Sequence, residues 1–136
     1  MPDRVLVTGI SGFVGGHVGL ALLKAGYEVR GSVRDLGKAE RVKQMLKEAG
    51  ADVARLELVA LDLTDDRGWD AAAAGCRYLQ HVASPFGIRM PKDPNELIRP
   101  AVEGTRRALE AALAADVERI LLTSSAAAVI DRTTPS

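Results

Sequence analysis

The sequence predicts an α/β fold in which a parallel sheet carries helices on both faces. Strand-like and helix-like segments alternate without interruption along the 136 residues, which is the pattern of repeated βα units. A glycine-rich turn at Gly9, Gly12 and Gly15 joins the first strand to the first helix. With right-handed crossovers, these observations favour a Rossmann-type doubly wound sheet with strand order 3-2-1-4-5.

Each expected strand is a short apolar run bounded by turn residues. The strands are expected over residues 4–8, 27–33, 56–61, 77–83 and 118–124. Apolar side chains recur at helical spacing over residues 13–25, 38–49, 69–74 and 94–115. Pro100 should bend or interrupt the last helix, and Thr64 or Asp65 could cap the short third one. Val14 belongs to the apolar stripe of the first helix, and Ile98 and Val102 belong to that of the last.

Composition limits the classes of function. The length fits one domain, residues 1–136, and no element is expected after the fifth strand, where the sheet is truncated. The 18 Lys and Arg residues balance 18 Asp and Glu residues, so no basic field favours nucleic acid or a membrane surface. Cys76 is the only cysteine, which excludes an internal disulfide. Without a signal peptide or an apolar run that could span a bilayer, we expect a cytoplasmic protein. No metal site is expected, because no second ligand accompanies His17.

The glycine turn has the features of a dinucleotide site. Gly9 permits the sharp turn, Gly12 lets a pyrophosphate approach the backbone, and Gly15 lets the helix pack close to its strand. The N–H groups at the start of the helix would then face the phosphates. A plain tight turn is the alternative, but the position between a strand and a helix favours the dinucleotide site.

The residue that ends the second strand favours NADP(H) over NAD(H). A carboxylate there would bind the ribose 2′-OH, whereas Arg34 offers a charged fork suited to a 2′-phosphate. Lys38 could add a second positive charge, while Asp35 could instead pair with Arg34 or Lys38. Asp62 follows the third strand and could accept from the adenine amino group while Leu63 packs on the ring. A loop or capping carboxylate is the alternative for Asp62.

Six segments together resemble the extended short-chain dehydrogenase/reductase family, in the branch that contains dihydroflavonol and cinnamoyl-CoA reductases. They are T-G-I-S-G-F-V-G-G-H (8–17), V-R-D (33–35), D-L-T-D (62–65), H-V-A-S-P-F (81–86), A-V-E-G-T (101–105) and R-I-L-L-T-S-S-A (119–126). The segments cover nearly the whole chain in the right order. The resemblance implies NADP(H)-dependent interconversion of a small-molecule carbonyl compound and its alcohol.

The resemblance also assigns roles by position. The pyrophosphate would be held by the loop residues Gly9, Ser11, Gly12, Phe13, Val14 and Gly15. Arg34 and Lys38 would take the 2′-phosphate, and Asp62 and Leu63 would frame the adenine. The nicotinamide side would be lined by Val82, Ala83 and Ser84, with Pro85 and Phe86 opening the substrate pocket. Ser125 is the favoured catalytic serine, with Ser124 as its nearest rival.

The chain departs from the family at the catalytic pair. The family mechanism uses Y-x-x-x-K downstream of the serine, where the tyrosine donates the proton and the lysine lowers its pKa. The only tyrosines here are Tyr27 and Tyr78, both upstream on strands, and no lysine follows Lys92. Whether this chain alone is an enzyme therefore stays open.

Three explanations of this departure differ in function. The favoured one is the cofactor-binding half of a carbonyl reductase, without its substrate lobe. The alternatives are a non-catalytic NADP(H)-binding protein or sensor and, ranked lower, a nucleotide-sugar epimerase or dehydratase of the same superfamily. An uncovered fifth strand would also promote dimers or aggregation through the exposed sheet edge.

Overall fold

The computed structural model describes residues 3–83 and 95–124, with side chains in the second range from Ile98 onward. These residues form one sheet with the order β3-β2-β1-β4-β5, so the predicted topology is confirmed. The strands are β1 (Arg4–Thr8), β2 (Glu28–Val33), β3 (Leu56–Ala60), β4 (Tyr78–His81) and β5 (Arg119–Leu122). Every strand pairing is parallel.

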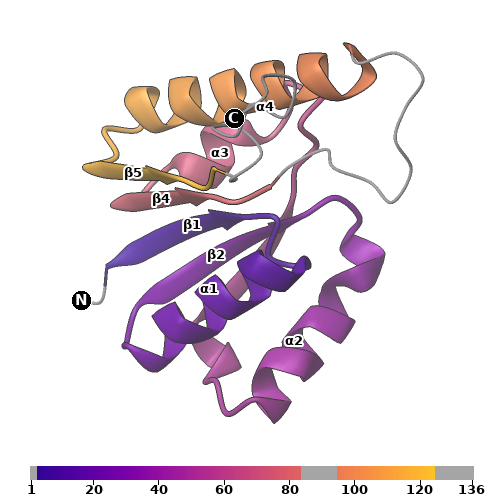
Figure 1. Ribbon diagram of the computed structural model, residues 1–136. Coiled ribbons are helices and arrows are strands. Elements are labelled where there is room, and N and C mark those ends of the chain that lie inside the picture. Colours follow the sequence, from indigo (N-terminus) through magenta and orange to yellow (C-terminus); the bar gives the residue numbers. More distant parts are fainter. Residues whose placement is uncertain (1–2, 84–94, 125–136) are drawn as a thin grey trace, which may run out of the picture.

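Helices cover both faces of the sheet, as Figure 1 shows. One face carries α1 (Phe13–Lys24) and α2 (Ala39–Glu48), and the other carries α3 (Trp69–Ala73) and α4 (Asn95–Ala114). Two short 3-10 turns, η1 (Leu36–Lys38) and η2 (Val53–Arg55), were not predicted. Each face therefore has its own core, and β1 contributes Val5 and Val7 to one and Leu6 to the other. This burial on both sides is typical of a central parallel strand.

The helices bury smaller residues than the apolar spacing predicted. In α1 the buried residues are Gly15, Gly19 and Leu23, and in α4 they include Ala108, Ala111 and Ala112. Val14 is 48% exposed, and Ile98 and Val102 are 55% and 63% exposed, so the predicted stripes were wrong at these positions. Small side chains let a helix approach its neighbours closely, and the close approach removes these small residues from solvent.

Two local expectations about helices differ from the structure. Pro100 does not interrupt α4, which runs through it as one helix; a bend at Pro100, the other expected effect, stays a prediction, and the predicted first residue, Pro94, lies outside the described residues. α3 follows Gly68 and has no side-chain cap, so neither Thr64 nor Asp65 caps it. Asp65 accepts hydrogen bonds from the backbone and guanidinium of Arg67 instead.

α4 is fastened to the loop between β3 and α3. Nη1 of Arg107 donates to the carbonyl oxygen of Leu63 over 2.7 Å, and its Nε donates to Asp66 over 2.6 Å. A Cβ on Gly104 would lie 2.6 Å from Cδ2 of Leu63, so the helix touches the loop where it has no side chain. In the same loop, the Trp69 indole donates to the carbonyl oxygens of Asp62 and Asp65.

Ile10 fills the space that two glycines leave between α1 and β2. A Cβ on Gly19 would lie 2.7 Å from Cδ1 of Ile10, and one on Gly31 would lie 2.6 Å from the same atom. Ile10 is 1% exposed, and its backbone N–H donates to the carbonyl oxygen of Ser32 over 3.1 Å. This contact holds the turn after β1 against the sheet.

Substitution of Gly31 tests this packing. Gly31→Ala should lower the free energy of unfolding by about 1–3 kcal/mol, because the added methyl group overlaps Ile10. Urea denaturation of the chain measures the effect. Gly16→Ala is the matched control, since a Cβ there would lie 3.5 Å from the nearest atom, the Ile10 carbonyl oxygen, and alanine favours the helix.

The double variant Ile10→Ala/Gly31→Ala should cost less than the sum of the two single changes, because truncated Ile10 leaves room for the new methyl group. Strict additivity of the two free-energy changes would contradict the proposed contact.

Arg107→Met should loosen the loop between β3 and α3, because the Leu63 carbonyl loses its donor. Trp69 is the only tryptophan, so its fluorescence reports on this loop, and we expect a red shift together with a lower urea midpoint. Arg106→Met is the control, since the Arg106 side chain is 61% exposed and lies 4.0 Å from Glu110. Equal effects of the two substitutions would contradict the role of Arg107.

β5 ends the sheet among the described residues, and its Leu121 and Leu122 are 47% and 52% exposed. Self-association through this edge stays a prediction. We expect the mass of the isolated chain in light scattering to rise with concentration, and Leu122→Lys to reduce that rise. A monomer at every concentration would contradict it.

Candidate functional site

A cleft of about 690 Å³ opens where the carboxyl ends of the central strands meet. It is lined by residues from the loops after β1, β2, β3 and β4, from the first turn of α1, from the end of β2 and from α4. They are Gly9, Ser11, Gly12, Phe13, Val14, Gly15, Ser32, Arg34, Leu61, Asp62, Leu63, Thr64, Val82, Ala83 and Pro100. The cleft lies at the point where strand order reverses, between β1 and its two neighbours. Ligands of doubly wound sheets bind at such switch points.

The glycine turn forms one wall of the cleft, and its backbone packs closely at two glycines. Gly9 has φ of +71°, and a Cβ there would lie 2.8 Å from the Cα of Ala83. A Cβ on Gly15 would overlap the carbonyl oxygen of Gly9. Gly12 is exposed, so a ligand can reach its backbone. The turn therefore fits only with glycine at Gly9 and Gly15.

Ser32 anchors this turn to β2. Its Oγ accepts from the Gly9 N–H over 3.1 Å, and its carbonyl oxygen accepts from the Ile10 N–H. Sequence reasoning missed Ser32, which looks like an ordinary small residue in a strand. Only the strand register would have identified it, because that register places Ser32 beside the turn.

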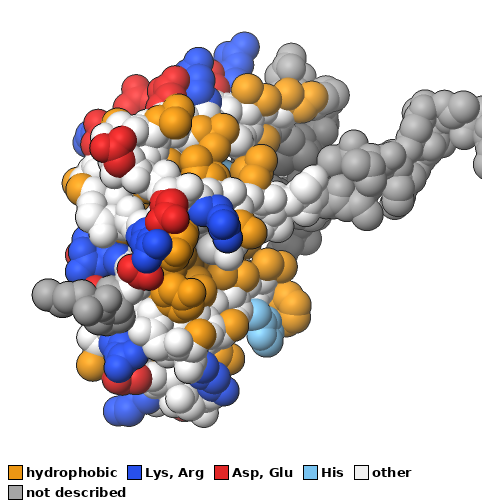
Figure 2. Space-filling model, turned by 90° about the vertical axis from the view of Figure 1, so that its left-hand side faces the viewer, with side chains coloured by type: hydrophobic (Ala, Val, Ile, Leu, Met, Phe, Trp, Pro, Cys, Tyr) orange, Lys and Arg blue, Asp and Glu red, His pale blue; other side chains and the backbone are white. Residues whose placement is uncertain are grey.

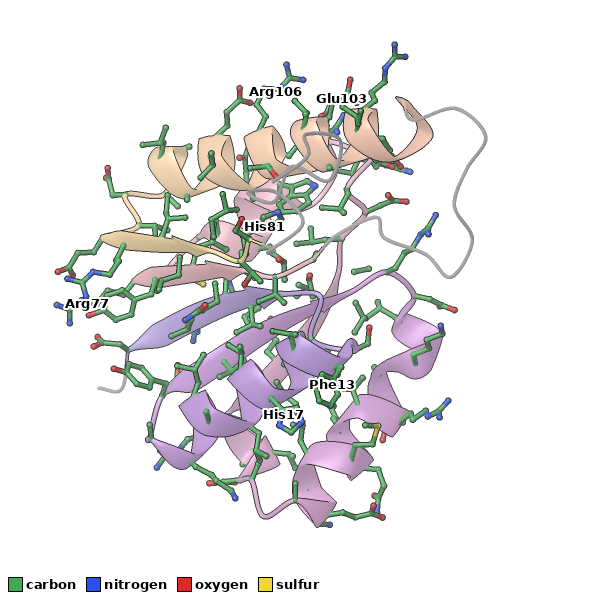
Figure 3. All side chains as sticks on the ribbon, in the orientation of Figure 1. Phe13, His17, Arg77, His81, Glu103 and Arg106 are labelled. Carbon is green, nitrogen blue, oxygen red and sulfur yellow. The ribbon has the colours of Figure 1, made fainter. Side chains whose placement is uncertain are left out.

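The amino end of α1 points into the same wall. Gly12 precedes the helix and offers no side-chain cap, and the first turn of this fully described helix contains no acidic residue. Uncapped N–H groups and the helix dipole favour an anion here. Phe13 is 82% exposed, and its ring lies edge-on to that of His17 with centroids 4.7 Å apart (Figure 3).

Arg34 and Asp62 face each other across the other end of the cleft. Nε of Arg34 lies 3.9 Å from Oδ2 of Asp62, and the Arg34 side chain is 86% exposed. Asp35 accepts from the Gly37 N–H over 2.9 Å, so its carboxylate caps η1. Lys38 ends η1 and is not among the residues that line the cleft.

The Asp62 carboxylate is held in place by its own loop. Its Oδ1 accepts from the backbone N–H of Thr64 over 2.9 Å and from the Thr64 hydroxyl over 2.7 Å. These hydrogen bonds, with a smaller contribution from the Arg34 charge, hold the pKa of Asp62 below its usual value. The carboxylate is therefore ionised at neutral pH, and its Oδ2 faces Arg34.

The predicted residues near the reacting end are only partly described. Val82 and Ala83 line the cleft, whereas Ser84, Pro85, Phe86 and Ser125 lie outside the described residues. Ser124 follows β5 and is exposed, but it is not among the residues that line the cleft.

Both tyrosines lie at the amino ends of strands, on the side of the sheet opposite the cleft. Tyr78 begins β4 and Tyr27 precedes β2, and their rings pack edge to face at 6.4 Å. Figure 2 views this face, on which acidic and basic side chains are interspersed among apolar ones. Arg77 belongs to this face and forms ion pairs with Asp3 and Glu118.

No helix in the described ranges has the length and apolar character needed to cross a bilayer.

Known proteins resemble both the sequence and the fold. The model of the NAD dependent epimerase/dehydratase family matches residues 5–135. Dihydroflavonol 4-reductase of Hordeum vulgare is 43% identical over 126 residues, which are 92% of this chain and 35% of that protein.

Two crystal structures extend the likeness. Yeast methylglyoxal/isovaleraldehyde reductase Gre2, complexed with NADPH, has a TM-score of 0.81 and 30% identity over 96% of this chain and 39% of its own. Vestitone reductase from alfalfa (Medicago sativa L.) has a TM-score of 0.72 and 30% identity over 92% of this chain and 37% of its own. The chain thus spans little more than a third of each of these proteins. Because the family model matches nearly its whole length, the chain belongs to the NAD dependent epimerase/dehydratase family, among relatives that are extended short-chain reductases.

Proposed function

We propose that this chain is the NADP(H)-binding part of an oxidoreductase that reduces a small-molecule ketone or aldehyde to an alcohol. The observation that carries the proposal is a single cleft, which has the glycine turn and the amino end of α1 at one end and the Arg34–Asp62 pair at the other. The similarity to dihydroflavonol 4-reductase and to a yeast reductase complexed with NADPH supports it.

The residues of the cleft fit a dinucleotide. The first turn of α1 offers backbone N–H groups for a pyrophosphate. Gly12 presents no side chain beside them, and its own N–H donates to the carbonyl oxygen of Gly9. Asp62 offers Oδ2 to the amino group of an adenine, since Thr64 already occupies Oδ1. Leu63 would pack on the ring, and Val82 and Ala83 would line the nicotinamide side.

Arg34 supports NADP(H) over NAD(H). Its side chain is mostly exposed, and its ion pair with Asp62 is long at 3.9 Å, so a phosphate would replace a weak partner. A guanidinium binds phosphate through two parallel hydrogen bonds, which a hydroxyl group cannot match. Lys38 would add a second, more distant positive charge.

The bound cofactor would supply the hydride, and this chain would bind and orient it. Ser125, or Ser124 as its rival, would donate a hydrogen bond to the reacting oxygen of the substrate. Neither Tyr27 nor Tyr78 reaches the cleft, since both lie at the amino ends of strands. Reduction therefore requires a proton donor other than these two residues.

The position of the tyrosines also favours a second candidate, a non-catalytic NADP(H)-binding protein or sensor. Hydride transfer to a carbonyl compound by this chain alone would exclude that candidate. An epimerase or dehydratase ranks lower, because Val33 stands where that branch tends to have a carboxylate.

Titration calorimetry with NADPH and NADH tests the cofactor preference. The chain should bind NADPH more tightly than NADH, and Arg34→Ala should weaken NADPH binding by about 10- to 100-fold, the value of a charged hydrogen-bonded contact. Its NADH affinity should change little, because NADH has no 2′-phosphate.

Arg106→Ala is the matched control, since Arg106 is an exposed arginine of α4 that does not line the cleft. It should leave both affinities unchanged. Equal affinities of the unaltered chain for the two cofactors would overturn the NADP(H) preference, and no binding of either would overturn the proposed function.

A further inference from the structure

A buried polar pair joins β1 to β4 directly behind the cleft. Thr8 and His81 are register partners, and they are 0% and 3% exposed. Figure 3 shows His81 in the interior, between the sheet and the helices above it. Its ring lies edge-on to that of Trp69 at 6.4 Å. A polar pair this deeply buried is tolerated only when it is hydrogen-bonded.

The hydrogen bonds of Thr8 determine which atom donates to which. Its Oγ1 lies 2.8 Å from Nδ1 of His81, and it accepts from the N–H groups of Val82 and Ala83 over 2.9 Å and 3.0 Å. A hydroxyl group has two lone pairs and one proton, and a backbone N–H can only donate. The two amides therefore use both lone pairs, and the hydroxyl proton is left for His81.

This assignment fixes the state of the imidazole. Nδ1 of His81 must accept a proton, so it carries none, and the neutral ring has its proton on Nε2. Burial lowers the pKa of His81 and is the only cause that does so, which agrees with a neutral ring. A proton on Nδ1 would point at the hydroxyl proton of Thr8 and find no acceptor, because the two amides already use both lone pairs of the Thr8 Oγ1.

The two amides lie in the wall of the cleft. Val82 and Ala83 follow β4 and line the cleft, and a Cβ on Gly9 would lie 2.8 Å from Cα of Ala83. The backbone of residues 82–83 therefore determines how closely the glycine turn can approach β4. Thr8 directly precedes this turn, so one hydroxyl group controls the spacing between the two sides.

We propose that His81 is a positioning residue: by accepting the Thr8 hydroxyl proton on Nδ1, it directs both lone pairs of Oγ1 to the amides of Val82 and Ala83. This contact holds the end of β4 against the glycine turn. Its consequence for NADPH rests on the proposed function, whereas the tautomer and the amide hydrogen bonds do not.

Nitrogen NMR of the full chain with ¹⁵N-labelled histidine tests the tautomer. His81 should carry its proton on Nε2 and none on Nδ1. The chain has two histidines, and the exposed His17 provides the second pair of nitrogen signals for comparison. A proton on Nδ1 of His81, as the other tautomer or as imidazolium, would overturn the proposal.

Amide hydrogen exchange at Val82 and Ala83 tests the positioning. His81→Leu and Thr8→Val remove the acceptor and the hydroxyl group, and each should speed exchange by about 5- to 10-fold, as expected for one lost hydrogen bond. His81→Asn keeps an acceptor near the position of Nδ1, and Thr8→Ser keeps the hydroxyl group, so these variants should retain the protection. Unchanged exchange in His81→Leu or Thr8→Val would overturn the proposal.

Calorimetry with NADPH tests whether the backbone of Val82 and Ala83, held by Thr8 and His81, affects the affinity of the chain for NADPH. His81→Leu and Thr8→Val should weaken binding, and His81→Asn and Thr8→Ser should restore most of it. Faster exchange with unchanged NADPH affinity would overturn the positioning role. If the unaltered chain binds no NADPH, the proposed function fails, and the tautomer and exchange results still decide the structural claim.

Discussion

The structure depends on the close approach of three backbone segments at the carboxyl end of β1. Gly9 lies against Ala83 on one side, and Gly15 lies against Gly9 on the other. A Cβ at either glycine would push α1 or the end of β4 away from the turn. These contacts hold α1 and the end of β4 close to the turn. The amino end of α1 therefore lies in the cleft, with its N–H groups exposed to a ligand.

The two ends of the cleft are built in opposite ways. Near Gly9 the shape of the wall follows from the close backbone contacts of Gly9 and Gly15, where no side chain fits. Near Asp62 the wall is a loop that side chains hold from three directions, through Thr64, the Trp69 indole and Arg107 of α4. The first arrangement leaves the N–H groups at the start of α1 without a side-chain partner, and the second fixes a carboxylate opposite Arg34. The polar groups of the second are held by hydrogen bonds within the chain, whereas those of the first favour an anion.

Local signals in the sequence predicted the strand order, the glycine turn and the residues Arg34 and Asp62. Periodicity and motif spacing report on neighbours along the chain, and the glycine turn depends on such neighbours. The strand order follows from the alternation of strands and helices together with the right-handed crossover rule. The anchors could not be predicted in the same way, since Ser32 is 23 residues from Gly9, Arg107 is 44 from Leu63, and His81 is 73 from Thr8. The predicted apolar stripes were wrong at Val14, Ile98 and Val102 because close packing buries glycine and alanine instead. A prediction from the spacing of large apolar residues gives these small residues little weight.

The parallel topology separates the cleft from both tyrosines of the chain. All the loops that line the cleft leave the carboxyl ends of strands, whereas Tyr78 stands at the amino end of β4. His81 lies three residue steps further along β4, a rise of about 10 Å, and the ring of Tyr78 is packed against Tyr27. Rotation of the side chain cannot cross that distance through a filled core. The residues that line the cleft are therefore separated from both tyrosines by the length of the strands, and neither phenol can act on a ligand bound there.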